Sequence, residues 1–328
     1  MFLTGGTGVV GRAVLSRLIA EGREVVALGR SERSRRTLAA LGASAVPGDI
    51  TDPVSLHEGM KGSDVVYHVA GLNRTCLPNP APLFEVNVSG SRNVVEAAAR
   101  AGVRRVVYTS SATTVGERRG EVGREDSPHR GWFLSEYERS KFEAEQVARS
   151  RASTLGVELV CVNPTSVQGP GRADGSARLL VLFLSGRLRF FVPTRFTFVD
   201  IDDCAAGHVL AETKGVPGER YLLSGASLEL EDALDLLARI TGVERRPRSI
   251  PVWLANTAGV LGELGGRLSR RPLPLCREVV RMLVHGHAYD GSKAARELGL
   301  RYTPAEETLR RAVDWLVQEG MVPSAATR

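Results

Sequence analysis

The chain has 328 residues, of which 43% are hydrophobic and 24% charged, an ordinary balance for a globular protein. This length suits one large domain with a smaller one beside it. The net charge is +6, but the basic residues are spread along the chain and aromatic residues make up only 5%, so no nucleic-acid surface is expected. The sequence has no apolar run approaching 18 residues and no basic segment before an apolar one at its start. It therefore predicts neither a membrane span nor a signal peptide.

The cysteines and histidines lack the spacings typical of a disulfide framework or a metal site. Four cysteines are scattered without a CxxC pair, which favours the reducing cytoplasm as the location. His285 and His287 are two residues apart and would share a face only on a strand, so no metal is expected.

The first half alternates short apolar segments with helical ones, which predicts a doubly wound parallel sheet of the α/β class. Several of the apolar segments are near-continuous, as strands buried on both faces should be. We expect strands at Phe2–Leu3, Glu24–Leu28, Ser44–Val46, Asp64–Ala70, Arg104–Ser110 and Val157–Asn163. We expect helices from the first glycine-rich loop to Gly22 and over Arg33–Leu41, Phe84–Ala101 and Ser135–Leu155.

The second half changes character after a segment rich in Gly, Pro and Arg, from Pro164 to Pro193. Arg220–Leu223 is expected to be a strand that returns to the main sheet, and Trp253 and Trp315 to anchor the core of a small domain. Helices are expected at Asp202–Thr213, Glu229–Thr241, Val252–Leu268, Leu275–His285, Ser292–Leu298 and Glu306–Glu319. The predicted domains are interleaved: a dinucleotide-binding domain over 1–165, to which 196–224 returns, and a smaller, mostly helical substrate-binding region over 166–195 and 225–328.

A glycine-rich loop lies between the first strand and the first helix. Gly5, Gly8 and Gly11 form a GxxGxxG pattern in the context that a dinucleotide site requires. Without side chains the backbone can approach a pyrophosphate, and the helix N-terminus supplies N–H donors and positive potential. The first domain is therefore predicted to be a Rossmann fold.

Arg30 follows the second strand, where folds of this type that take NAD usually place an acidic residue. An arginine there instead accommodates the 2′-phosphate of NADP, since a planar guanidinium suits bidentate phosphate contact. Arg33 is grouped with Arg30, whereas Arg35 and Arg36 are expected to form only a solvated helix face. The predicted cofactor is NADP, with NAD as the alternative.

Tyr137 and Lys141 are four residues apart on one face of a predicted helix. A tyrosine titrates near pH 10, too high for a base at neutral pH. An ammonium group about 5 Å away would favour the phenolate by roughly 3 kcal/mol. We therefore expect Lys141 to lower the pKa of Tyr137.

A hydroxyl group is expected beside Tyr137, at the carboxyl end of the strand that ends in Thr109, Ser110 and Ser111. The spacing from Tyr137 favours Ser111, although Ser110 and Thr109 remain alternatives.

The motifs TGGTGVVG, GDITD, YHVAG, NVSGSRNVVEAA, VVYTSSAT, YxxSK and NPTSVQGPG resemble those of the extended short-chain dehydrogenase/reductase superfamily, within its NAD-dependent epimerase/dehydratase group. The match covers nearly the whole chain. It looks most similar to the dihydroflavonol-4-reductase-like and hopanoid-associated sugar-epimerase-like branch, through FTFVDIDDCAAGHVLA, GERYLLSG and the C-terminal SKAARELGLRYTPAEETLRRAVDWL.

The resemblance implies a catalytic role for each of four residues. Ser111 would orient the substrate carbonyl, Tyr137 would act as acid/base, and Lys141 would grip the nicotinamide ribose. Asn87 would complete a proton relay, although it could equally be only a polar residue early in a helix. The cofactor-binding residues implied by the loop, Arg30 and the family are Gly5, Thr7, Gly8, Val9, Val10, Gly11, Arg30, Arg33, Asp49, Ile50, Val69, Ala70, Gly71, Tyr137, Lys141, Pro164, Ser166 and Val167.

Together these features favour an NADPH-dependent ketone reductase, of the hydroxysteroid- or dihydroflavonol-reductase type, acting on a small carbonyl or alcohol substrate. The alternatives are an NAD-dependent nucleotide-sugar epimerase or dehydratase and a non-catalytic NADP-sensing protein. Dehydratases usually carry an acidic pair after the catalytic Ser/Thr, whereas this chain has Ala112 and Thr113. The family resemblance also implies a homodimer, in which helices 84–101 and 135–155 would pair through exposed apolar residues.

Overall fold

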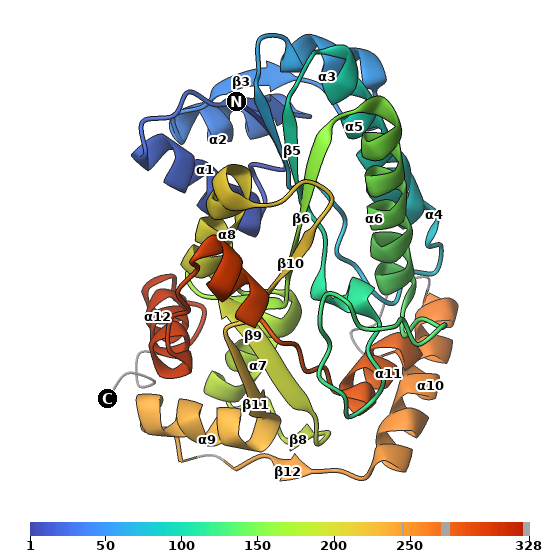
Figure 1. The fold of residues 1–328 in the computed structure, drawn as a ribbon. Coiled ribbons are helices and arrows are strands. Elements are labelled where there is room, and N and C mark those ends of the chain that lie inside the picture. Colours follow the sequence, from blue (N-terminus) through green and yellow to red (C-terminus); the bar gives the residue numbers. More distant parts are fainter. Residues whose placement is uncertain (245, 270–275, 324–328) are drawn as a thin grey trace.

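The protein is described here by a computed structural model covering residues 1–244, 246–269 and 276–323. Its main layer is a seven-stranded, fully parallel sheet in the order β10-β6-β5-β4-β1-β2-β3 (Figure 1). The strands are β1 (Phe2–Thr4), β2 (Val26–Gly29), β3 (Ser44–Pro47), β4 (Val65–His68), β5 (Arg105–Thr109), β6 (Glu158–Pro164) and β10 (Arg220–Leu223). The prediction of a doubly wound parallel sheet is confirmed.

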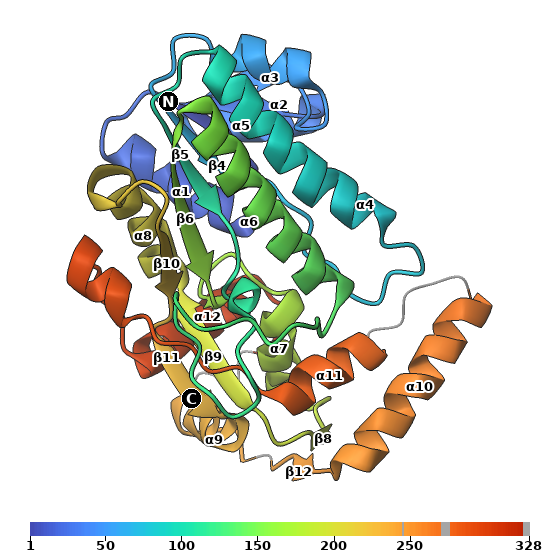
Figure 2. The same ribbon diagram turned by 45° about the vertical axis from the view of Figure 1, so that its right-hand side comes forward.

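Helices cover both faces of this sheet and enclose two separate cores. On one face lie α1 (Val9–Ala20), α2 (Glu32–Ala40) and α8 (Ile201–Lys214). On the other lie α3 (Pro53–Met60), α5 (Gly90–Arg100) and α6 (Glu136–Leu155) (Figure 2). The central strands are buried on both sides, which explains why their sequences are apolar without alternation.

A second layer lies beyond the carboxyl ends of the main strands and has its own core. Its elements are a three-stranded sheet of β7 (Ser166–Gln168), β9 (Arg195–Asp200) and β11 (Ala226–Glu229), a strand pair of β8 (Phe190–Phe191) and β12 (Arg248–Ser249), and the helices α7 (Arg178–Leu184), α9 (Leu230–Thr241) and α12 (Ala305–Gln318). The sequence predicted none of these strands, because each is short and most lie in or next to segments rich in Gly, Pro and Arg.

The chain crosses between the layers more than once. After β9 it returns to the main layer, where α8 packs on α1 and β10 pairs with β6. Arg220–Leu223 is therefore the returning strand that the sequence predicted, but β9 belongs to the small sheet. The predicted domain bounds remain a prediction.

Two further helices form one side of the second layer, α10 (Val252–Ser269) and α11 (Arg277–His285). Leu275, the predicted start of α11, lies outside the described residues. Trp315 packs against the core as expected, but Trp253 is 67% exposed on α10, so its predicted role as a core anchor is wrong.

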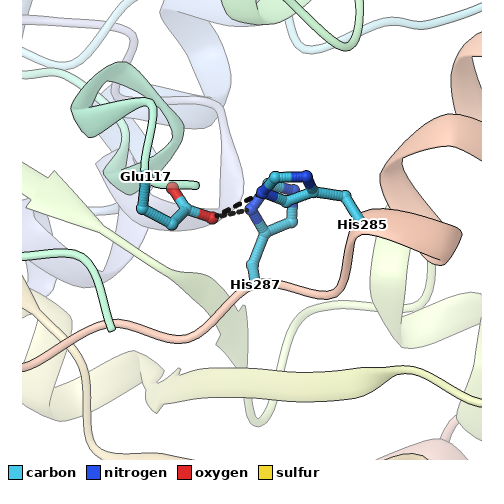
Figure 3. Close-up of side chains that lie close together, drawn as sticks. All are labelled: Glu117, His285 and His287. Carbon is cyan, nitrogen blue, oxygen red and sulfur yellow. Dashed lines mark hydrogen bonds and ion pairs between the residues drawn. The ribbon is translucent and has the colours of Figure 1, made fainter. Parts of the chain in front are cut away.

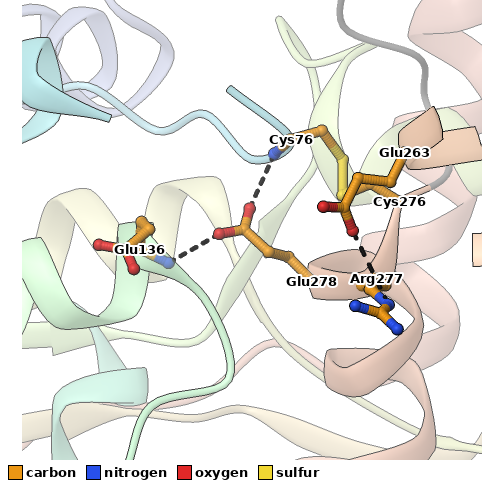
Figure 4. Close-up of a disulfide and its surroundings, with 6 residues drawn as sticks. All are labelled: Cys76, Glu136, Glu263, Cys276, Arg277 and Glu278. Atoms are coloured by element: carbon orange, nitrogen blue, oxygen red, sulfur yellow. Dashed lines mark hydrogen bonds and ion pairs between the residues drawn. A yellow bond between two sulfur atoms is a disulfide. The ribbon is translucent and has the colours of Figure 1, made fainter. Parts of the chain in front are cut away.

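A disulfide joins Cys76, in the segment after β4, to Cys276 at the start of α11 (Figure 4). Glu278 supports the same junction, since its carboxylate accepts hydrogen bonds from the backbone N–H groups of Cys76 (2.8 Å) and Glu136 (2.9 Å). The prediction of a chain without disulfides is therefore wrong. Its two cysteines are 200 residues apart, and only the fold brings them together.

The predicted homodimer requires exposed apolar residues on α5 and α6. Of their large apolar side chains, only that of Leu155 is exposed, because the two helices pack on each other and on the sheet. The expected exposed apolar faces are thus absent from these helices, and the homodimer rests on the family resemblance alone. Among the described residues, no helix is both long and apolar enough to cross a membrane.

Candidate active site

The glycine-rich loop packs too tightly to admit side chains. A Cβ atom at Gly5 would lie 2.5 Å from the Ala70 nitrogen, and one at Gly11 would lie 2.0 Å from the Gly5 carbonyl oxygen. Gly5 also has a φ of +75°, a conformation that favours glycine. Gly8 is the N-cap of α1 and has no capping side chain, so the N–H groups of the first turn are left for an anionic ligand. This cradle fits the diphosphate of a dinucleotide.

Buried polar groups connect the end of strand β4 to Thr4, the residue just before the glycine-rich loop. Thr4 Oγ1 lies 2.8 Å from His68 Nδ1 and accepts a hydrogen bond from the Ala70 N–H at 3.2 Å. His68 is fully buried, which lowers its pKa to about 3, so it is neutral at physiological pH. His68 therefore fixes the position of Ala70, opposite Gly5, rather than carrying charge.

Arg30 lies at the carboxyl end of β2, with its side chain 72% exposed. Its Nε atom lies 4.0 Å from the carboxylate of Asp49, which comes from the segment after β3. Arg33 is also exposed, whereas Arg35 and Arg36 both pair with Glu32 on α2. Arg30 and Asp49 thus stand together at the edge where the adenosine end of a dinucleotide would lie.

The other residues predicted to bind the cofactor lie at or near the same edge of the sheet. Ile50 is buried against Gly90, and Asn93 donates to its carbonyl oxygen. The remaining positions are Thr7, Val9 and Val10 at the start of α1, Val69, Ala70 and Gly71 after β4, and Pro164, Ser166 and Val167 at the end of β6 and in β7. Val167 itself is buried in the core, and the Ser166 hydroxyl lies 2.5 Å from that of Ser176.

Ser111 and Tyr137 meet at the carboxyl end of β5. Ser111 is the N-cap of the short 3₁₀ helix Ala112–Val115, and Tyr137 lies in the first turn of α6, which Ser135 caps. The Ser111 hydroxyl lies 2.9 Å from that of Thr113, and it is close enough to the Tyr137 phenol to act on the pKa of Tyr137. Of the three candidate hydroxyl groups, Ser111 is thus the one beside Tyr137, since Ser110 bonds Glu145 and Thr109 bonds His208.

Burial raises the pKa of Tyr137 above its ordinary value, and the nearby Ser111 hydroxyl and the charge of Arg172 only partly oppose this rise. The expectation that Lys141 lowers this pKa is therefore wrong for the structure. Tyr137 is a protonated phenol at neutral pH, which is the form that donates a proton.

Lys141 points toward the sheet instead of toward the Tyr137 hydroxyl. Its ammonium group donates to the carbonyl oxygen of Thr109 (2.8 Å) and to the hydroxyl of Tyr108 (3.4 Å). Burial lowers the pKa of Lys141 to about 8, against the opposing charge of Glu145.

Asn87 lies near Lys141, in a π-helical segment (Glu85–Ser89) between α4 (Ala81–Phe84) and α5. Its side-chain amide bonds both backbone groups of Leu72 and the hydroxyl of Ser140. Asn87 Oδ1 and Lys141 Nζ lie 3.3 and 3.8 Å from the point where a Gly71 Cβ would stand. The π-helical turn interrupts the single helix that the sequence predicted and places Asn87 at the site.

Glu145 supports the carboxyl end of β5 and was not predicted. Its fully buried carboxylate accepts hydrogen bonds from Ser110 (2.5 Å), Thr114 (2.9 Å) and Asn163 (2.7 Å), and pairs with Arg220. It lies one turn after Lys141 on the same helix face. An acidic residue on the buried face of that helix was the available signal.

Comparison with known proteins agrees with this geometry. The model of the NAD dependent epimerase/dehydratase family matches residues 1–224. The chain is 33% identical to a putative dihydroflavonol 4-reductase of Synechocystis (98% of this chain, 95% of that protein) and 33% identical to sterol demethylase protein B of Methylococcus capsulatus (98% and 99%). It shares 26% identity and a TM-score of 0.79 with the nucleoside-diphosphate-sugar epimerase PA4631 from Pseudomonas aeruginosa, over 98% of both chains. The chain belongs to the NAD-dependent epimerase/dehydratase family of the extended short-chain dehydrogenase/reductases.

Proposed function

We propose that this enzyme reduces a ketone to a secondary alcohol with NADPH. The observation that carries the proposal is that the Ser111 and Tyr137 side chains lie near each other at the carboxyl end of β5, beside the glycine-rich cradle. A reduced nicotinamide cofactor, held by the glycine-rich cradle and Lys141, would supply the hydride for the carbonyl carbon.

The residues of the chain handle the oxygen and the proton. The Ser111 hydroxyl donates to the carbonyl oxygen and holds it against Tyr137, whose phenol gives that oxygen its proton as the charge develops. By family resemblance, the ammonium group of Lys141, which here donates to the Thr109 carbonyl, would bind the nicotinamide ribose. Asn87, which contacts Ser140 one residue before Lys141, would complete a proton relay in the same resemblance.

Arg30 favours NADPH over NADH in this proposal. Its guanidinium group is exposed just after β2 and suits bidentate contact with a 2′-phosphate, and Arg33 is exposed three residues later. The Asp49 carboxylate, 4.0 Å away, offsets part of the charge of Arg30.

Nucleotide-sugar epimerisation is the second candidate, since the family includes it and PA4631 is named for it. An epimerase would retain NAD and return the hydride to the substrate, whereas net reduction consumes NADPH. Ala112 and Thr113 stand where dehydratases usually carry an acidic pair, which disfavours dehydration. A non-catalytic NADP sensor is disfavoured because both Tyr137 and Lys141 are present.

The test is consumption of NADPH by the purified enzyme with a panel of ketones, including cyclic and steroid-like ones. We expect turnover with at least one ketone, loss of it in Tyr137→Phe, and retention in Tyr221→Phe, whose hydroxyl accepts a hydrogen bond from Val216 instead. Conversion of a nucleotide sugar without net change in the cofactor would favour the epimerase.

The expected assembly is a homodimer, by family resemblance. Light scattering at micromolar concentration should give twice the mass of 35.3 kDa, and a monomer mass would contradict it. A cytoplasmic location also remains a proposal, against which the Cys76–Cys276 disulfide weighs.

A further inference from the structure

Glu117, His285 and His287 form a buried cluster outside the proposed catalytic group (Figure 3). Glu117 lies just after the 3₁₀ helix Ala112–Val115, His285 is the last residue of α11, and His287 follows two residues later. The chain turns at Gly286, which has a φ of +64°, so both rings face one carboxylate although they are not on a strand. One donor atom from each residue lies within 4.8 Å of the others.

The polar groups of the cluster are incompletely satisfied by one another. Glu117 Oε1 lies 2.6 Å from His287 Nδ1 and 3.4 Å from His285 Nε2. Glu117 Oε2 and His285 Nε2 are buried without a hydrogen-bond partner among the described residues. The nearby Arg130 donates to the Glu117 backbone and pairs with Glu138. Within the described part of the chain, a carboxylate that is 1% exposed therefore faces two imidazoles and pairs with no arginine.

We propose that Glu117, His285 and His287 bind one Zn²⁺ ion. Two imidazole nitrogens and a carboxylate oxygen are a common zinc donor set, at about 2.0–2.2 Å from the metal. In a tetrahedral site such donors stand roughly 3.3–3.4 Å apart. The distance of 3.4 Å between Glu117 Oε1 and His285 Nε2 already fits this geometry. The distance of 2.6 Å between Glu117 Oε1 and His287 Nδ1 would have to increase by less than about 1 Å. The Tyr289 hydroxyl, 2.9 Å from His287 Nδ1, is within reach of the fourth position.

The ion would have a structural role. It would tie the loop after Ser111 and its 3₁₀ helix to the segment that follows α11, where Gly123 and Tyr289 already pair through their backbones. The site is buried and uses none of the residues assigned to hydride transfer. Zinc should therefore act on stability, whatever substrate the enzyme takes.

The test uses the full chain without a histidine tag, stripped by a chelator and titrated with Zn²⁺ against a chromophoric chelator. We expect one zinc per chain with a Kd below about 0.1 μM, as for structural zinc. Saturation should raise the Tm by about 3 °C or more. No uptake at micromolar Zn²⁺ overturns the proposal.

Substitutions identify the ligands. Glu117→Gln and His287→Gln should each weaken binding by about 10²-fold or more, while His57→Gln, on α3, should leave it unchanged. Uptake that survives both ligand substitutions would place the zinc elsewhere and overturn the assignment. If the variants fail to fold, X-ray absorption of the Co²⁺-loaded wild type decides: two imidazoles with oxygen ligands support the site, and sulfur ligands refute it.

Discussion

Breaking the Cys76–Cys276 disulfide should destabilise the protein strongly. The bond closes a loop of 200 residues, so its loss restores about 18 cal/mol/K of entropy to the unfolded chain on the loop-closure model. At 25 °C this is about 5 kcal/mol of lost stability, an upper bound. Glu278 still joins the same segments through Cys76 and Glu136 when the bond is broken, so the folded junction itself should survive.

The expected loss is therefore about 3–5 kcal/mol in the free energy of unfolding. Urea denaturation should be followed for the oxidised wild type, the reduced wild type and the double variant Cys76→Ser/Cys276→Ser. With an m-value of about 3 kcal/mol/M, the midpoint should fall by about 1 M or more on reduction.

The double variant and the two free cysteines of the chain serve as controls. Reductant should leave the double variant unchanged, because Cys161 and Cys204 are free thiols. Thiol counting after unfolding without reductant should give two free groups, and four after reduction. Four free thiols before reduction, or equal midpoints with and without reductant, would refute the reasoning.

The remaining predictions concern the catalytic group and the cofactor. Tyr137→Phe should lower turnover by about 10² or more, and Ser111→Ala should lower turnover alone, with cofactor affinity by fluorescence titration unchanged in both. Arg30→Asp should reverse a preference for NADPH over NADH in the same titration, and equal wild-type affinities would contradict this. The folded pKa of Lys141, about 8, lies below its unfolded value, so the unfolded chain binds the extra proton between about pH 8 and 10.5. The free energy of unfolding of the wild type, measured by urea denaturation relative to that of Lys141→Met, should thus rise by about 2 kcal/mol from pH 7 to pH 10. If this difference between the two proteins stayed constant or fell over that range, the lowered pKa of Lys141 would be contradicted.

The sequence predicted the parts of the fold that depend on local pattern. Apolar runs such as Asp64–Ala70, alternating with helical segments, are typical of strands buried in a parallel sheet, and the glycines before α1 are typical of the turn between a strand and a helix in a dinucleotide site. Tyr137 and Lys141 share a helix face by spacing alone. The parallel sheet, the glycine-rich turn and the common helix face of Tyr137 and Lys141 can therefore be predicted from the sequence alone.

The failures all involve contacts between distant segments. Spacing could not show that Lys141 would bond the Thr109 carbonyl rather than approach the Tyr137 hydroxyl, because that depends on the depth at which α6 packs on β5. Nor could it show that Cys76 would meet Cys276, or that Glu117 would lie against His285. Most strands of the second layer were missed because strands of two to four residues carry little periodicity, and the six-residue β9 directly follows the segment rich in Gly, Pro and Arg.

The repeated crossing of the chain between the two layers limits how such an enzyme can be re-engineered. Because β7, α7 and β9 leave the main layer and α8 and β10 come back to it, no single cut separates the second layer from the first. Grafting that region from a relative with another substrate would need three joints, after β6, after β9 and after β10, each close to the parallel sheet. New specificity in this chain should therefore be sought by substitutions in place rather than by exchange of modules.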